Sequence, residues 1–156
     1  MTMLIDTHAH LCDSVFDGDL DSVLERAQHA GVTAIIAVAE NLADAEKNLA
    51  LAAQHPMIRP AAGLYPTLLD LEAAAVMRGF IQKHRHELRA IGEVGLDHWM
   101  VKEEPERENQ REIFRGFIEL SKELNLPLNV HSRSAGRHAI DLLLKLGATR
   151  VQLHAF

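Results

Sequence analysis

Cysteine is almost absent from this sequence, and long apolar runs are missing altogether. Cys12 is the only cysteine among 156 residues, so the chain cannot close an intramolecular disulfide. Such a composition fits a reducing compartment, and we expect a cytoplasmic location. No apolar stretch approaches the roughly 18 residues of a membrane span, and the N-terminus lacks the regions of a signal peptide. The sequence therefore predicts no association with a membrane.

An excess of positive charge is also lacking. Twenty-two acidic residues outnumber 16 basic ones, which gives a formal net charge of -6 at pH 7. No basic patch indicates a nucleic-acid partner. If the substrate is an anion, a bound metal must supply much of the local attraction. The hydrophobic content of 47% is ordinary for a soluble globular protein, and 156 residues can bury one substantial core.

Apolar runs rich in β-branched residues alternate with helical patterns along the chain. The runs are nearly continuous, as buried parallel strands are. Six strands are predicted, at residues 3–8, 33–40, 58–64, 89–96, 128–132 and 150–154. Between them, Asp19, Asn41 and Ser134 can each cap a helix, and Pro105 suits a first helical turn. The alternation predicts an α/β fold with a parallel sheet, and the lack of a linker predicts one domain spanning 1–156.

Two parallel architectures compete for this pattern. A doubly wound sheet commonly has a glycine-rich phosphate turn after its first strand, and no such turn follows residue 8. A TIM (β/α)8 barrel instead takes site residues from the ends of several strands, as the candidates below do. A barrel needs about 250 residues, whereas this sequence supplies six strands. We therefore expect a truncated barrel, and its open sheet edges predict self-association.

Five candidate metal ligands stand at the ends of four predicted strands. His8 and His10 are two residues apart on an extended chain, so their side chains point the same way. Glu93, His131 and His154 end later strands. Imidazole and carboxylate groups suit zinc, manganese or a similar divalent ion. Five ligands are too many for one tetrahedral ion with an open position, so we predict two ions that share Glu93.

Polar residues next to these ligands have more than one interpretation. Asn129 and Gln152 lie one step below two of the histidines, where they either hydrogen-bond each other or the ligand rings, or form a polar layer in the barrel. Asp97 is expected to orient a ligand or a loop. Arg133 either binds a substrate phosphate or makes a salt bridge at the barrel rim. Trp99 either stacks on a base or covers the rim.

The motifs together resemble those of the TatD family of metal-dependent hydrolases, and most closely the TatD domain-containing protein 3 type. The matching segments span the whole chain, in the order that the family shows. They are DTHAHL at 6–11, IGEVGLD at 91–97, LPL at 126–128, HSRSAGR at 131–137 and LHAF at 153–156. The resemblance implies a TIM barrel of the amidohydrolase type that binds divalent metals and cuts phosphodiester bonds, typically in DNA.

The resemblance also implies roles for single residues. It assigns metal binding to His8, His10, Glu93, His131 and His154, with Glu93 as the catalytic carboxylate and zinc, magnesium or manganese as the ions. The family has a further metal-binding Asp near the end of strand eight, beyond the last residue here. Tyr65 stands where the family more often has His, and it can donate a hydrogen bond to a substrate oxyanion but cannot carry positive charge.

Three functions remain open at the level of sequence. The leading one is a two-metal phosphodiesterase, a deoxyribonuclease of the TatD type. The second keeps the metals but changes the bond to another ester or amide, as in a lactone, a phosphotriester or an aminoacyl-tRNA, because fold alone does not choose the substrate. The third is a truncated, inactive metal-binding fragment.

Overall fold

The computed structural model describes residues 3–156, and six strands alternate with helices along it. The strands are β1 (Leu4–Ala9), β2 (Val32–Ala37), β3 (Ile58–Ala62), β4 (Ala90–Gly95), β5 (Leu128–His131) and β6 (Val151–His154). The helices are the short 3-10 helix η1 (Ser14–Phe16) and α1 (Leu20–His29), α2 (Leu42–Gln54), α3 (Leu71–Lys83), α4 (Glu104–Leu124) and α5 (Gly136–Lys145).

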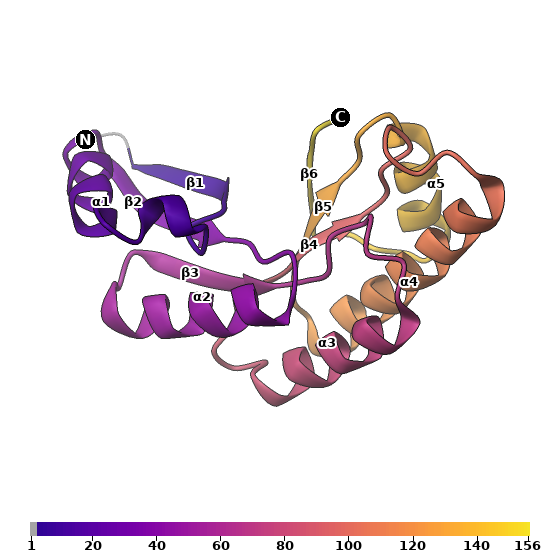
Figure 1. Ribbon diagram of the computed structural model, residues 1–156, viewed down its shortest axis with the longest axis horizontal. Helices are drawn as coiled ribbons and strands as arrows, with labels where there is room; N and C mark the ends of the chain where they lie inside the picture. The colour runs from indigo at the N-terminus through magenta and orange to yellow at the C-terminus, as the bar shows by residue number, and fades with distance from the viewer. Residues whose placement is uncertain (1–2) are drawn as a thin grey trace.

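All six strands belong to one parallel sheet, and their order in space is their order in the sequence, β1 to β6. A doubly wound sheet reverses its strand order at a switch point, whereas a barrel does not. Figure 1 shows the strands following an arc, with α2, α3 and α4 on its outer side. The predicted α/β fold, the first six strands of a TIM-type barrel, is confirmed.

The core is deepest around β4 and β5, every residue of which is buried. Phe114 and Phe117 of α4 are fully buried against this part of the sheet, in a cluster that includes Ile91 and Leu128. β1 contrasts with it, because its first four residues are exposed and β1 is one end of the strand order. Site residues on β4 and β5 are therefore held by a rigid core, and those on β1 by an edge strand.

Only some of the predicted capping residues cap a helix in the structure. Asn41 caps α2, since its side-chain oxygen accepts a hydrogen bond from the Asp44 amide at 3.1 Å. Asp19 precedes α1 but makes no side-chain capping bond. The prediction that Ser134 caps α5 is wrong: the turn after β5 puts Ser134 at a left-handed φ of 55°, and Ala135 takes the capping position. A cap residue normally has extended backbone angles, which Ser134 lacks.

Within residues 3–156, no helix combines the length and the apolar character that a membrane crossing requires.

Candidate metal centre

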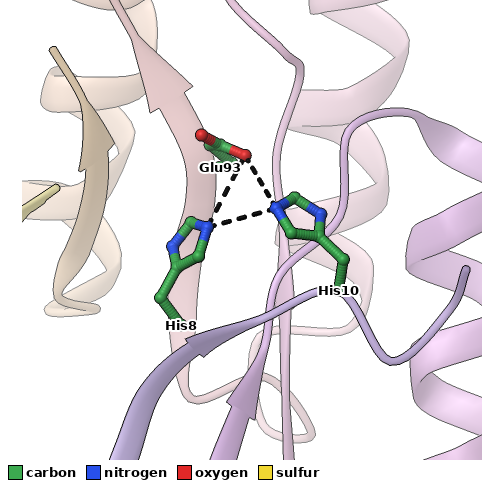
Figure 2. A group of neighbouring side chains, drawn as sticks. All are labelled: His8, His10 and Glu93. Carbon is green, nitrogen blue, oxygen red and sulfur yellow. Dashed lines mark hydrogen bonds and ion pairs between the residues drawn. The ribbon is translucent and has the colours of Figure 1, made fainter. Parts of the chain in front are cut away.

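The first half of the site joins the end of β1 to the middle of β4. His8 lies in β1 and His10 just beyond it, and their Nε2 atoms approach to 3.2 Å. The Oε2 atom of Glu93 on β4 lies 3.3 Å from Nε2 of His10 and 3.8 Å from Nε2 of His8. Figure 2 shows the three side chains pointing toward one another from the two strands. Three ligand-type atoms thus converge on one point.

The second half of the site uses the other oxygen of the same carboxylate. Oε1 of Glu93 lies 2.8 Å from Nδ1 of His131 on β5 and 2.7 Å from Nε2 of His154 on β6. The carboxylate itself is buried, with 1% of its side chain exposed. The rings of His8 and His154 stack at a centroid distance of 3.8 Å, so the two halves adjoin. Each oxygen of Glu93 therefore faces its own pair of imidazoles.

Glycines beside Glu93 allow β4 to approach its neighbours this closely. A Cβ atom on Gly95 would lie 2.1 Å from the carbonyl oxygen of His131, and the residue has a φ of +144°. A Cβ atom on Gly92 would lie 2.6 Å from Cβ of Asn129. Both distances are far inside van der Waals contact, so only glycine fits at these positions. The sequence GEVG thus sets the spacing of β4 and β5 at the site.

The electrostatics of the site favour a charged carboxylate among imidazoles. Burial raises the pKa of Glu93, but hydrogen bonds from His131 and His154 outweigh it and lower the pKa to about 2. Burial lowers the pKa of His8, which keeps its ring neutral and able to bind a metal. For His131 burial also lowers the pKa, but hydrogen bonds to Glu93 and Asp97 outweigh it and raise the value. Negative charge is therefore concentrated at Glu93, between the two pairs of rings.

The donor set fits divalent cations. Oε2 of Glu93 is buried and has no hydrogen-bond partner within residues 3–156. A buried carboxylate oxygen without a partner is costly. A cation between it and the nitrogens of His8 and His10 would satisfy all three atoms, and a second cation would suit Glu93, His131 and His154. Imidazole with carboxylate is a ligand set for zinc and similar transition ions.

Two neighbours orient the rings of the candidate ligands through their outer nitrogens. Nδ1 of His8 donates to Oδ1 of Asn129 at 2.8 Å, and the Asn129 amide donates to the Thr7 carbonyl at 2.6 Å. Nε2 of His131 donates to Oδ2 of Asp97, which is fully buried, at 2.9 Å. These bonds leave Nε2 of His8 and Nδ1 of His131 facing the centre. Such partners fix the ring orientation in metal sites and raise the basicity of the ligand.

Glu40 also lies near a candidate ligand ring, at ion-pair distance without a hydrogen bond, and it was not among the residues predicted from the sequence. Its Oε1 lies 3.7 Å from Nδ1 of His10, on the side of the ring away from Glu93. Burial raises the pKa of Glu40, and the nearby His10 opposes that shift. The signal was present in the sequence, because Glu40 ends a predicted strand just as the ligands do.

Gln152 lies beside Asn129, as predicted, but makes neither of the hydrogen bonds that were one of the two alternatives for it. It is the register partner of Asn129 on β6, yet its Nε2 donates to the Leu153 carbonyl at 3.0 Å. Its Oε1 is buried without a hydrogen-bond partner among the described residues. Within residues 3–156, Gln152 therefore bonds neither Asn129 nor a ligand ring, because the Asn129 side chain is already engaged by His8 and Thr7.

Tyr65 and Arg133 lie at different distances from the centre. The Tyr65 ring packs edge-on against His131, with ring centroids 5.2 Å apart, and burial raises the pKa of its phenol. Arg133 is exposed and lies over the ring of Trp99, with its guanidinium carbon 5.0 Å from the ring centroid. Within the described residues no carboxylate lies at salt-bridge distance from Arg133. Tyr65 thus packs against a candidate metal ligand, and Arg133 lies further out, on Trp99.

We expect Asn129→Ala to weaken metal binding about 10- to 100-fold, because His8 loses the partner that fixes its ring. Isothermal titration with Zn²⁺ or Mn²⁺ measures the effect. Gln152→Ala is the matched control, since Gln152 faces Asn129 in the β5–β6 register without touching a ligand ring. Equal losses in the two variants would contradict an orienting role for Asn129.

Comparison with known proteins agrees with this geometry. Residues 5–156 match the family described as TatD related DNase. Human "Deoxyribonuclease TATDN3" is 42% identical over 168 residues, which cover 98% of this chain and 60% of that protein. "Uncharacterized metal-dependent hydrolase YabD" of Bacillus subtilis is 34% identical over 158 residues, covering 99% of this chain and 61% of that one.

Solved structures of TatD proteins have a similar fold. The crystal structure of YJJV, a TatD homolog from Escherichia coli, superposes with a TM-score of 0.82 at 29% identity, covering 92% of this chain and 56% of that one. A TatD family hydrolase from Entamoeba histolytica superposes with a TM-score of 0.80 at 24% identity. The chain thus spans between 55% and 61% of the length of these relatives. On this evidence the chain belongs to the TatD related DNase family.

Proposed function

We propose that the chain carries the metal ligands of a two-metal hydrolase that cuts phosphodiester bonds, as a deoxyribonuclease of the TatD type. The observation that supports this best is the division of the Glu93 carboxylate, whose two oxygens each face a separate pair of imidazoles. A carboxylate shared in this way is suited to bridge two ions. The metals would be zinc, magnesium or manganese, and the imidazole ligands favour zinc or manganese over magnesium.

Each side chain of the site has its own role in the proposed mechanism. Bound in pairs, divalent ions polarise a phosphoryl oxygen and lower the pKa of a coordinated water. Glu93 is the catalytic carboxylate, because its side chain belongs to both groups of proposed ligands and would contact both ions. Asn129 and Asp97 keep one nitrogen of His8 and of His131 aimed at the centre. The Tyr65 hydroxyl donates a hydrogen bond to a substrate phosphate oxygen beside His131, and Arg133 binds a flanking phosphate.

DNA as the substrate is supported by the relatives. The human relative is named a deoxyribonuclease. This chain carries a net charge of -6, so ions at the centre would supply the attraction for a polyanion that the surface as a whole does not.

The direct test is cleavage of single- and double-stranded oligonucleotides in the presence of Mg²⁺, Mn²⁺ or Zn²⁺, with EDTA as the blank. Both this chain and a full-length protein that contains it should be assayed. We expect metal-dependent phosphodiester cleavage by the full-length protein. Hydrolysis of a lactone or an aryl phosphotriester, with none of DNA under any of the three metals, would replace the proposal with the second function considered above.

Two further proposals concern the organisation of the chain. We propose that residues 1–156 act as one domain, because the strands form one continuous sheet. We also propose that the chain self-associates through β1, where Leu4 and Ile5 are about half exposed. An unpaired edge strand with apolar side chains is a pairing surface. Sedimentation of the chain as a monomer at all concentrations would contradict self-association.

Cys12 supports a reducing compartment such as the cytoplasm, and it offers a simple check of the local packing. Burial raises the pKa of its thiol to about 11, and Sγ donates to the Val38 carbonyl at 3.6 Å. We expect native Cys12 to react with a disulfide reagent at pH 8 roughly a hundredfold more slowly than the unfolded chain, because the thiolate is the reactive form. Equal rates with and without denaturant would contradict this packing.

A further inference from the structure

The segment that follows β4 places a large aromatic side chain in solvent. Trp99 is 54% exposed, although Trp is among the residues with most to gain from burial. It is the only tryptophan of the chain. Most loop side chains of this size fold back on the protein. An exposed indole beside a candidate metal centre therefore indicates a surface for a flat ligand.

Two cations lie over the ring of this indole. Nζ of Lys102 lies 5.1 Å from the centroid of the Trp99 ring, and Cζ of Arg133 lies 5.0 Å from it. Both distances are in the range of cation–π attraction. Neither cation has a carboxylate at salt-bridge distance within residues 3–156. We call Trp99, Lys102 and Arg133 the rim cluster.

Hydrogen bonds tie the rim cluster to the metal centre. Oδ1 of Asp97 accepts from the backbone amides of Trp99 and Met100 at 2.9 and 2.8 Å, while Oδ2 accepts from Nε2 of His131 at 2.9 Å. The Arg133 carbonyl accepts from the His98 amide at 3.0 Å. One buried carboxylate thus fixes both a candidate ligand and the turn that carries the indole. A molecule held on the rim cluster is therefore connected to the candidate ligand His131 through Asp97 and the turn that Asp97 holds.

We propose that the rim cluster binds single-stranded DNA: an unpaired nucleobase stacks on Trp99 in place of a cation that now lies over the ring, and Lys102 and Arg133 contact the neighbouring phosphates. The identification of DNA as the ligand of the rim cluster rests on the proposed function. An indole offers stacking that every base can use, and the two cations match the phosphates on either side of a base. Within a duplex the faces of a base are covered by its neighbours, so the cluster selects unpaired strands or frayed ends.

The single tryptophan makes stacking directly measurable. The chain is titrated with oligothymidylate in EDTA, so that no bond is cut, and Trp99 emission is recorded. We expect saturable quenching. An abasic sugar-phosphate oligomer of equal length should bind about tenfold more weakly and leave the emission nearly unchanged, and a blunt duplex should also bind more weakly. Equal binding of all three, without quenching, would overturn the proposal.

Substitutions in the rim cluster distinguish the contribution of base stacking to DNA binding from that of electrostatic attraction. Trp99→Ala should weaken binding of a dye-labelled oligothymidylate about tenfold by anisotropy, whereas Trp99→Phe keeps a ring and most of the affinity. Leu144→Ala, which trims an exposed apolar side chain on α5, is the control and should change nothing. The double variant Lys102→Ala/Arg133→Ala should reduce the slope of log K against log salt by about 1.4, the value for two phosphate contacts with a single strand. An unchanged affinity in Trp99→Ala overturns the proposal.

The outcomes for the rim cluster and for the proposed function can be told apart. Metal-dependent cleavage of DNA together with no quenching of Trp99 would leave the nuclease standing and overturn the rim cluster as a base platform. Quenching by oligothymidylate together with no cleavage under any metal would support the platform and overturn the nuclease.

Discussion

Glu93→Gln should lower metal-dependent DNA cleavage by the full-length protein by a factor of about a thousand or more. The two-metal arrangement supplies several kcal/mol of transition-state stabilisation, and each 1.36 kcal/mol is about tenfold in rate. An amide keeps the volume of the carboxylate but offers only one acceptor oxygen and no charge. It cannot face His8 and His10 with one oxygen and His131 and His154 with the other. We also expect the number of bound ions to fall.

The control for this change is Glu87→Gln. Glu87 also pairs with a histidine, since its Oε1 lies 2.7 Å from Nδ1 of His84, but the pair is exposed and lies outside the site. We expect its cleavage rate and metal content to equal those of the wild type. Circular dichroism of Glu93→Gln should show a folded chain, so that lost activity reports on the site. Full activity in a folded Glu93→Gln protein would refute the bridging role.

Gly95→Ala should destabilise the chain by about 4 kcal/mol. Part of this is backbone strain, roughly 1–3 kcal/mol for a side chain at an unfavourable positive φ, and overpacking adds a similar amount. The new Cβ would meet the carbonyl oxygen of His131, a backbone atom that can move only with β5. The strain therefore falls on the strand pair that holds Glu93 and His131. Chemical denaturation measures the change in the free energy of unfolding.

Gly79→Ala is the matched control for Gly95→Ala. Gly79 lies inside α3, and a Cβ there would meet no atom within 4 Å. Alanine is the better helix former by up to about 1 kcal/mol, so this variant should be unchanged or slightly more stable. Unfolding curves for Gly95→Ala and Gly79→Ala that coincide would show that the close approach of β4 and β5 is not required.

The positions of the ligands could be predicted from sequence because parallel strands place their carboxyl ends on one rim. Once residues 90–95 and 128–131 are recognised as strands, Glu93 and His131 must lie near each other. The period of two likewise predicts that His8 and His10 share a face. These are statements about backbone geometry, which hydrophobic patterns report well.

Side-chain partners could not be predicted in the same way. Gln152 and Asn129 are equivalent in register, yet only Asn129 reaches a ligand ring, because His8 and the Thr7 carbonyl on β1 satisfy its amide first. Likewise, Arg133 lies on the Trp99 ring, and Ser134 adopts a left-handed φ that removes it from the capping position. Such choices depend on loop conformation and rotamers, for which a hydrophobic pattern carries no signal.

The central feature of the proposed site is one carboxylate, that of Glu93, shared between two cations. Anomalous diffraction from crystals of the chain grown with Mn²⁺ or Zn²⁺ tests it most directly. We expect two peaks about 3.5–4 Å apart, one bound by His8, His10 and Glu93 and the other by Glu93, His131 and His154. A single peak, or two peaks without Glu93 between them, would contradict the account.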